Sequence, residues 1–284
     1  NATPEGIERA RVAAERALAL SPNGSAGHLA MGAYLRALRR DYEGAKRQFD
    51  AGLASDPNNA LLLGGAASVE RILGHYDDAV AHLRRAATLD PRSVATARQL
   101  AYALHDTRRY TDALKEFDRG LAISPGNLAL IQGKATSFVS LGRLDSARAF
   151  VARQLQTVDT TALLVQFSLF QEQMWILDPA LWPKIVVLRP RDFDNDPGHW
   201  GLKVGRTYML MGDSARARAY GDSALMAFRR QLATDPGNAQ YQELVARALA
   251  LGGHRTDAVD AAEKSLEMRE TKLDASTGPY VKFQ

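Results

Sequence analysis

The sequence of 284 residues contains no cysteine, which excludes disulfides, thiol nucleophiles and thiolate metal sites but does not identify the compartment. Aromatic residues make up only 7% of the chain, and no stretch approaches the roughly eighteen consecutive apolar residues of a membrane-spanning helix. The net charge is +4, and no run of five or more basic residues occurs. We therefore predict no nucleic-acid partner and no membrane span in this chain.

Motifs of catalysis and cofactor binding are also missing. The six histidines form no His-Glu-x-x-His motif, and neither a nucleophile elbow nor a phosphate-binding or dinucleotide-binding glycine loop occurs. His75 and His82 do not share a helix, because His75 falls in the turn before the helix that carries His82. Gly64-Gly65 lies inside an expected helix, where close helix packing explains it better than phosphate binding. We predict no enzymatic activity, no cofactor and no metal.

The chain does contain a block that returns every thirty-four residues. In each block a tyrosine is followed three residues later by an alanine, and then by a proline: Tyr42, Ala45 and Pro57; Tyr76, Ala79 and Pro91; Tyr110, Ala113 and Pro125. A fixed period of this length predicts stacked helical hairpins, which bury their apolar faces against neighbouring repeats. The prolines end the second helix of each hairpin, because proline lacks the amide hydrogen that a helix interior requires.

Apolar periodicity predicts one helix over residues 5–20, two helices over residues 25–57, and further helix pairs over residues 60–91, 94–125 and 128–159. The interval from Pro22 to Pro57 is one residue longer than the period, which predicts a one-residue insertion near residues 37–40. Asp159 stands where the next proline is expected. Residues 1–160 therefore read as a regular array that starts with an unpaired second helix.

Residues 161–200 break the period and read as a divergent helical joint, with a helix over 162–175, a short helix after Asp178-Pro179 and a loop over 189–198. The period resumes in residues 201–284, but Ala217 and Pro236 are nineteen residues apart, where Ala45 and Pro57 are twelve apart. The seven extra residues are about two helical turns, which predicts a lengthened second helix. The last unit also runs long before residues 277–279, and residues 280–284 read as the start of another helix.

The repeated positions are a turn glycine, the tyrosine that opens the second helix, a closely packed alanine, a large aromatic residue and the closing proline: Gly74 and Gly142; Tyr42, Tyr76 and Tyr110; Ala45, Ala79, Ala113 and Ala147; Phe49 and Phe117; Pro57, Pro91 and Pro125. They resemble the tetratricopeptide repeat (TPR) family, although the tryptophan of the first helix is absent. The resemblance implies an all-α fold, a right-handed superhelical solenoid of antiparallel helix pairs, and a role as a protein–protein interaction scaffold.

The long-helix units, the divergent joint and the junction at residues 277–280 carry a narrower resemblance. They are similar to the C-terminal repeat arrays of multidomain bacterial signalling proteins, in which a serine/threonine kinase, a cyclase or a winged-helix regulator precedes the array. No kinase motif occurs in this chain. The resemblance implies a scaffold that belongs to a bacterial signalling or regulatory protein.

In the family that these repeats resemble, the first helix of each hairpin lines a concave surface that binds a polypeptide segment. By that resemblance the inward positions hold mostly basic and polar side chains: Arg36, Arg71, Arg98, Tyr102, His105, Gln132, Arg206, Gln240, Glu243 and Arg247. Such a set suits an extended acidic peptide, held by charge-assisted hydrogen bonds. The alternative is that these are ordinary solvated residues of an arginine-rich chain. Gly64 and Ser68 replace two residues of the clamp that holds a peptide C-terminal carboxylate in some relatives, so that ligand is not implied.

The joint also concentrates aromatic residues: Phe167, Phe170, Trp175, Trp182, Phe193 and Trp200. One interpretation is a local core that bridges two sub-arrays of different curvature. The other is a partner hot spot formed by Trp175, Trp182 and Trp200, since tryptophan is enriched in such spots. The sequence leaves both interpretations open.

Self-association is the alternative function. The chain opens with an unpaired second helix and closes on the start of a first helix, so neither end carries the polar cap that keeps a solenoid soluble. Open ends of this kind stack head to tail into a filament, since a heterologous contact need not close into a ring.

Overall fold

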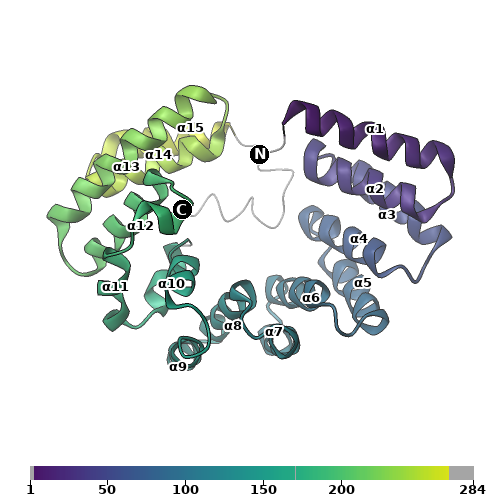
Figure 1. Ribbon diagram of the computed structural model, residues 1–284, viewed down its shortest axis with the longest axis horizontal. Helices are drawn as coiled ribbons and strands as arrows, with labels where there is room; N and C mark the ends of the chain where they lie inside the picture. Colours follow the sequence, from purple (N-terminus) through teal and green to yellow (C-terminus); the bar gives the residue numbers. More distant parts are fainter. Residues whose placement is uncertain (1–2, 170, 269–284) are drawn as a thin grey trace. The chain divides into compact units, whose positions relative to one another are not determined.

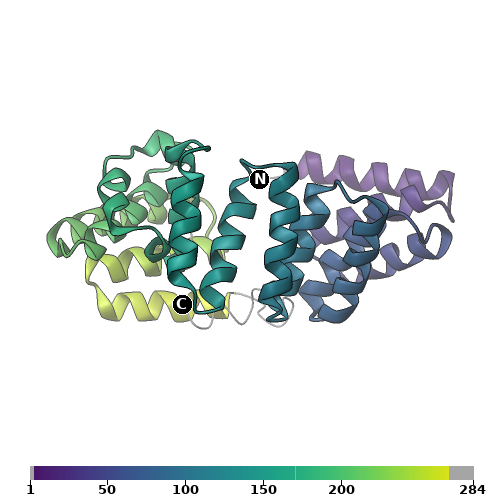
Figure 2. The same ribbon diagram turned by 90° about the horizontal axis from the view of Figure 1, so that it is seen from below.

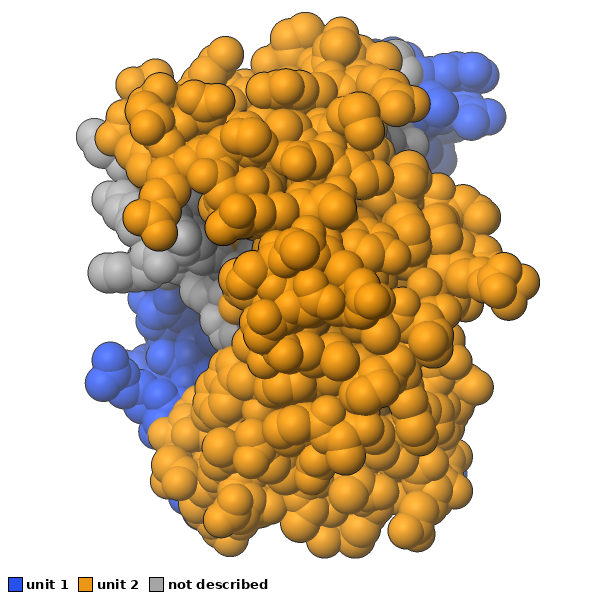
Figure 3. All heavy atoms as spheres, turned by 90° about the vertical axis from the view of Figure 1, so that its left-hand side faces the viewer, with its two compact units in different colours: residues 1–137, 271–284 blue, residues 138–270 orange. Residues whose placement is uncertain are grey.

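The structure is a computed structural model that describes residues 3–169 and 171–268. Every regular element within those residues is helical and none is a strand, which confirms the all-α prediction. The chain divides into two compact units (Figure 3). The described part of unit 1 is residues 3–137, and that of unit 2 is residues 138–169 and 171–268. The expected boundaries at residues 160 and 200 stay a prediction.

Unit 1 is a stack of helix pairs. Its helices are α1 (Pro4–Leu20), α2 (Ser25–Tyr34), α3 (Tyr42–Ser55), α4 (Ala60–Leu73), α5 (Tyr76–Leu89), α6 (Val94–Asp106), α7 (Tyr110–Ile123) and most of α8 (Leu128–Ser140). Within this unit the first helices α2, α4 and α6 form one layer, and the second helices α3, α5 and α7 form another (Figures 1 and 2). The predicted helix pairs of a TPR-type solenoid are confirmed.

Side-chain caps explain where the first helices begin. Asn59, Ser93 and Asn127 each lie two residues after a repeat proline, and each accepts a hydrogen bond from a backbone N–H of the first helical turn. Such a cap satisfies a donor that the helix itself leaves unpaired. Asp159 does the same for the next first helix, because its Oδ1 accepts from the Ala162 N–H at 2.7 Å. The residue that replaces the expected proline is therefore a cap.

The turn inside each hairpin needs one residue in the left-handed conformation. Gly74 and Gly142 adopt it with φ of 84° and 72°. Arg40 and Arg108 adopt it at the same repeat position, with φ of 53° and 59°, although a side chain there is strained. The backbone closes in the same way after Gly74 and Arg108: the His75 N–H donates to the Glu70 carbonyl, and the Arg109 N–H to the Leu104 carbonyl.

The one-residue insertion is confirmed at the end of α2. A π-helical turn, η1 (Leu35–Arg39), follows α2, and the Asp41 N–H donates to the Leu35 carbonyl at 3.0 Å. A π-turn accommodates one more residue than an α-turn. The extra residue is thereby absorbed before α3 begins at Tyr42, so the second helix keeps its phase.

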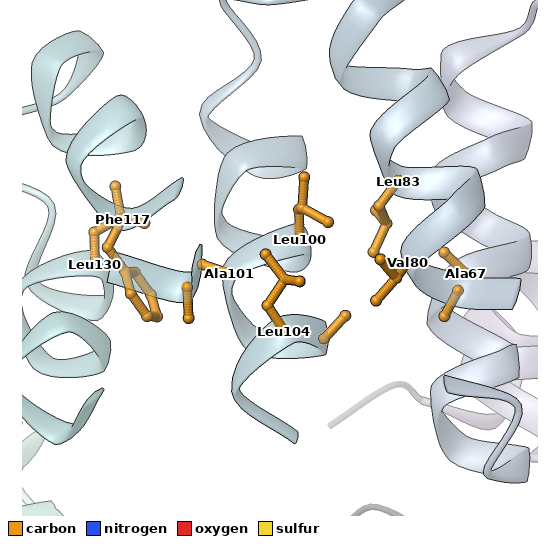
Figure 4. Packing of buried hydrophobic residues seen from close by; sticks show 11 residues of the cluster. Ala67, Val80, Leu83, Leu100, Ala101, Leu104, Phe117 and Leu130 are labelled. Atoms are coloured by element: carbon orange, nitrogen blue, oxygen red, sulfur yellow. The ribbon is translucent and has the colours of Figure 1, made fainter. Parts of the chain in front are cut away.

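Unit 1 is held together by large side chains that pack on small ones. Phe49 of α3 lies between Gly32 of α2 and Gly65 of α4, where an added Cβ would come within 2.6 Å of its ring. Gly64 has no such neighbour, because its nearest contact would be the Gln99 Oε1 at 3.7 Å. The next pairs share the cluster drawn in Figure 4, which includes Val80, Leu83, Leu100, Leu104, Phe117 and Leu130. The close-packing interpretation of Gly64-Gly65 therefore holds at Gly65 alone.

Unit 2 begins with the end of α8 and continues with α9 (Leu144–Gln154), α10 (Thr160–Leu169), the 3-10 helices η2 (Gln171–Ile176) and η3 (Pro179–Leu181), α11 (Trp182–Val186) and η4 (Pro190–Phe193). The short helix after Asp178-Pro179 is confirmed. The helix over 162–175 is wrong beyond Leu169. The buried Lys203 side chain donates to the Leu169 carbonyl at 2.8 Å, so this carbonyl is satisfied without a further helical turn.

The remaining helices of unit 2 are α12 (Pro197–Leu210), α13 (Ser214–Thr234), α14 (Ala239–Gly252) and α15 (Arg255–Glu267). The expected loop over 189–198 is wrong at both η4 and the start of α12; Asp194 and Asn195 between them are left-handed. α13 has 21 residues where α3, α5 and α7 have 14, which confirms the lengthened second helix. The features expected over residues 277–284 lie outside the described residues.

Candidate functional site

The ten residues expected on the concave face fall into two sets. In unit 1, Arg36 lies in η1 after α2, and the first helices α4, α6 and α8 carry Arg71, Arg98, Tyr102, His105 and Gln132. In unit 2, α12 and α14 carry Arg206, Gln240, Glu243 and Arg247. We name the unit 1 set, together with Asp106, the first-helix surface.

Arg71 is engaged by a carboxylate within the protein. Its Nε and Nη2 donate to one Asp106 oxygen, Oδ2, at 3.0 and 2.6 Å. Arg71 lies in the last turn of α4, and Asp106 is the last residue of α6. Their side chains are 24% and 25% exposed, so water and a ligand both reach this ion pair. The contact joins two neighbouring hairpins.

Tyr102 lies at the centre of the charged groups of this surface. Burial raises the pKa of its phenol, while the positive charges of Arg98 and Arg71 act in the opposite direction. Its hydroxyl donates to the Ala129 carbonyl at 3.0 Å, and its ring packs edge-on against Phe117. Arg98 is exposed and makes no ion pair with the described residues. Tyr102 is therefore a packing residue, and its phenol lies within electrostatic range of both guanidinium groups.

The other three residues of this set differ in how much of the side chain a ligand could reach. Gln132 is only 5% exposed and lies inside the packing of α8. Burial lowers the pKa of His105, which keeps its imidazole neutral at neutral pH. Arg36 is half-buried, and its Nε has no hydrogen-bond partner among the described residues. The positive charge of the surface thus comes from arginines alone.

The set in unit 2 is closer to electrical balance. Arg247 and Glu243 form an ion pair one helical turn apart on α14, with side chains 20% and 18% exposed. Gln240 is exposed in the first turn of α14, and Arg206 of α12 is half-buried. An acidic ligand would find less unbalanced positive charge here than in unit 1.

The tryptophans of the joint have different surroundings. Trp200 is fixed inside unit 2, since its Nε1 donates to the Leu188 carbonyl at 2.8 Å and its ring meets Tyr220 edge-on. Trp175 is 39% exposed, and its carbonyl accepts from Arg148 Nη2 at 3.1 Å. Trp182 is half-buried, and its Nε1 has no partner among the described residues. Phe167 and Phe193 are buried, and Phe170 lies outside the described residues.

A second charged cluster, which the sequence reasoning missed, joins α3, α4 and α5. Glu70 is 1% exposed, and its Oε2 is 2.9 Å from His82 Nδ1. Its other oxygen is 3.9 Å from Lys46 Nζ, which also bonds Asp50 at 2.7 Å. The hydrogen bond with Glu70 raises the pKa of His82 above its ordinary value, against the opposing effect of burial. A buried charge with several partners of this kind has a structural role, and we name Lys46, Asp50, Glu70 and His82 the Glu70 cluster.

Metal and membrane sites are not found in the described part of the chain. No three histidine, aspartate or glutamate side chains there come close enough together to hold a metal ion. None of the helices between residues 3 and 268 that the structure describes has the length and apolarity of a bilayer-crossing segment.

Comparison with known proteins supports the repeat family. Residues 29–93 and 65–127 match the family model described as Tetratricopeptide repeat. A curated relative, the Small glutamine-rich tetratricopeptide repeat-containing protein 2 of Mycosarcoma maydis, is 26% identical over 110 residues, or 39% of this chain. That match spans about a third of the relative's own length, at 31%.

A solved structure supports the fold over most of the chain. The crystal structure of the APC/C hetero-tetramer Cut9-Hcn1 matches 98% of this chain and 46% of its own, with a TM-score of 0.57 and 13% identity. An identity this low shows the fold alone. The fold is thus a solenoid of helix pairs like that of tetratricopeptide repeat proteins, a class that generally mediates protein–protein interaction.

Proposed function

We propose that this chain is a protein-binding module that holds an extended acidic polypeptide along the first-helix surface of unit 1. The proposal is carried by the charge on that surface. Arg36, Arg71 and Arg98 contribute three positive charges, and Asp106 contributes one negative charge. Arginine suits this role because its planar guanidinium binds carboxylates through two parallel hydrogen bonds.

The spacing of the helices favours an extended ligand. Neighbouring packed helices lie roughly 8–10 Å apart, and an extended segment in the polyproline II conformation advances about 3.1 Å per residue with three residues per turn. A bound segment that crosses the first helices would therefore present about every third side chain to successive helices. Arg71 and Arg98 come from the neighbouring first helices α4 and α6, so acidic residues at that spacing would meet both.

The test is a binding titration with a synthetic peptide that carries glutamate at every third position between glycine and serine. Isothermal calorimetry would compare it with a peptide of the same design that carries lysine. We expect the glutamate peptide to bind more tightly, and its affinity to fall as salt is added. The substitutions Arg71→Gln and Arg98→Gln should each weaken binding.

Arg84→Gln is the matched control, because Arg84 is an exposed arginine on the second helix α5. It removes the same net charge from the other layer and should leave the affinity unchanged. Equal binding of the glutamate and lysine peptides would overturn the proposal, as would indifference to both first-helix substitutions.

The signalling context and the head-to-tail filament stay predictions. Sedimentation velocity over a range of concentrations tests the filament directly. A single species with a constant sedimentation coefficient would end that alternative, and a coefficient that grows with concentration would favour it over peptide binding.

A further inference from the structure

The C-terminal end of α6 is an unusual position for a carboxylate, and Asp106 lies there. It ends α6, where the last carbonyl groups give the helix a partial negative charge that disfavours an acidic side chain. The helix itself gains nothing from this charge. Its ion-pair partner is Arg71, thirty-five residues away on the neighbouring hairpin.

The contact between Arg71 and Asp106 resembles the way in which an arginine binds the carboxylate of a ligand. Two nitrogens of the Arg71 guanidinium donate hydrogen bonds to one carboxylate oxygen of Asp106, at 3.0 and 2.6 Å. Charge-assisted contacts of this kind are how arginine recognises acidic groups. Three-quarters of each side chain is covered, yet both remain open to solvent. The Tyr102 phenol lies within electrostatic range of the pair and of Arg98.

We propose that Asp106 is an internal competitor that occupies Arg71 until a carboxylate of the bound polypeptide replaces it. The inference rests on the proposed function and names a specificity-determining residue within that site. With Asp106 in place, a ligand gains Arg71 only by displacing an existing ion pair. Asp106 therefore sets a threshold. A weakly acidic segment meets Arg98 but does not displace Asp106 from Arg71. A segment with carboxylates at the right spacing engages both arginines.

The test is the variant Asp106→Asn with the glutamate peptide described above. Because exposed ion pairs are modest, we expect the affinity to rise by about two- to fivefold. In the Arg71→Gln background the same change should bring no gain, since the competitor then has nothing to occupy. This double-mutant cycle separates a local effect through Arg71 from a general one.

Asp118→Asn is the matched control. Asp118 of α7 pairs with Lys134 of α8, so this variant also removes one negative charge and one ion pair between helices. It should not raise the affinity. Thermal melts followed by circular dichroism would show that both variants are folded.

The possible results separate the two proposals. If the wild-type chain binds the glutamate peptide and Asp106→Asn binds no better, the competitor role is wrong and the proposed function stands. A gain that persists without Arg71, or that Asp118→Asn reproduces, would also overturn the competitor role. If neither the wild-type chain nor Asp106→Asn binds the peptide, both proposals fail. Binding by Asp106→Asn alone would support the competitor role, whereas the failure of the wild-type chain to bind would overturn the proposed function.

Discussion

Unit 1 and unit 2 stack helix pairs by the same contacts but connect them differently. In unit 1, Phe49 packs on the glycines of two first helices, and in unit 2 Phe228 packs on Gly198 in the same way, at 2.6 Å from an added Cβ. From α3 to α8, unit 1 needs only a cap or a left-handed turn between successive helices. Unit 2 inserts 3-10 turns, and polar side chains inside it satisfy the backbone groups that these turns leave unpaired.

That difference separates two requirements of a helical stack. Small-to-large packing is needed wherever helices touch, so it recurs in both units. The regular period is needed only where the connection is short. Where the period fails, Lys203 and Trp200 donate to the carbonyls of Leu169 and Leu188. A break in the repeat is therefore tolerated when side chains replace the missing backbone partners.

The largest expected effect comes from a pair of adjacent glycines in unit 1. Gly65→Ala places a Cβ against the Phe49 ring and should destabilise unit 1 by about 1–3 kcal/mol. Gly64→Ala meets only the Gln99 Oε1 at 3.7 Å and should stabilise by about 0.5–1 kcal/mol, because alanine is the better helix former. Urea denaturation measures both. If the two variants behave alike, the packing account of unit 1 is wrong.

The second prediction concerns Lys203, whose side chain donates to the carbonyl at the end of α10, where the regular repeat is interrupted. Lys203→Met keeps the length of the stem but leaves the Leu169 carbonyl without its donor, at a cost of about 1–3 kcal/mol. Hydrogen exchange followed by mass spectrometry should show faster exchange in α10, with α4 and α6 unchanged. Lys184→Met, at an exposed position, is the control. Unchanged exchange in α10 would mean that its end is held by other contacts.

The third prediction uses the turn position of unit 1. Arg108→Gly removes a side chain from a residue with φ of 59° and should raise the free energy of unfolding by about 0.5–1 kcal/mol. Gly142 already provides glycine at the equivalent position, so Gly142→Arg should do the reverse. Thermal unfolding of the two variants checks the sign. A loss of stability in Arg108→Gly would show that the arginine contributes more than its backbone strain costs.

The smallest expected effect is a pH dependence of the folding stability that arises at the Glu70 cluster. The pKa of His82 is raised by its hydrogen bond with Glu70 and by the nearby Asp50 and Asp78, so the folded state binds the proton more tightly than the unfolded state. The resulting stability is complete below the ordinary value of 6.5 and is lost as the pH rises through the folded pKa.

His82→Gln isolates this effect, because His105 has its pKa lowered by burial and so contributes with the opposite sign. The wild-type chain should be more stable than His82→Gln in mild acid, and the difference should shrink at alkaline pH. His82 is about one-third exposed, at 31%, so the difference should be small. A nuclear magnetic resonance titration of His82 that gives an ordinary or lowered pKa would contradict the account.

Much of the fold could be predicted from local signals. The closing prolines, the tyrosines at 42, 76 and 110, and the longer interval before Pro236 correctly indicated helix pairs and a lengthened α13. The end of α10 could not be predicted, because it depends on Lys203, which is thirty-four residues away. The left-handed arginines were also missed, since glycine is the only clear sequence signal for that conformation.

The candidate site was less predictable than the fold. Residue positions within the repeat placed Arg71 and Arg98 in the predicted set, but no signal in the composition indicated that Asp106 pairs with Arg71. The spacing of one repeat plus one residue between Arg71 and Asp106 was the available signal. This spacing predicts the ion pair only once the last turns of α4 and α6 are known to be neighbours.

The sequence by itself determined that this chain forms helices and that they stack in pairs, because caps, prolines and small residues act within a few positions of where they stand. Only the tertiary structure decided which side chains remain open to a partner. Arg71 is paired, Gln132 is covered and Trp200 is tied to a carbonyl through contacts with residues that the sequence places elsewhere. Burial and ion pairing depend on what lies across the fold, and a single stretch of sequence does not contain that information.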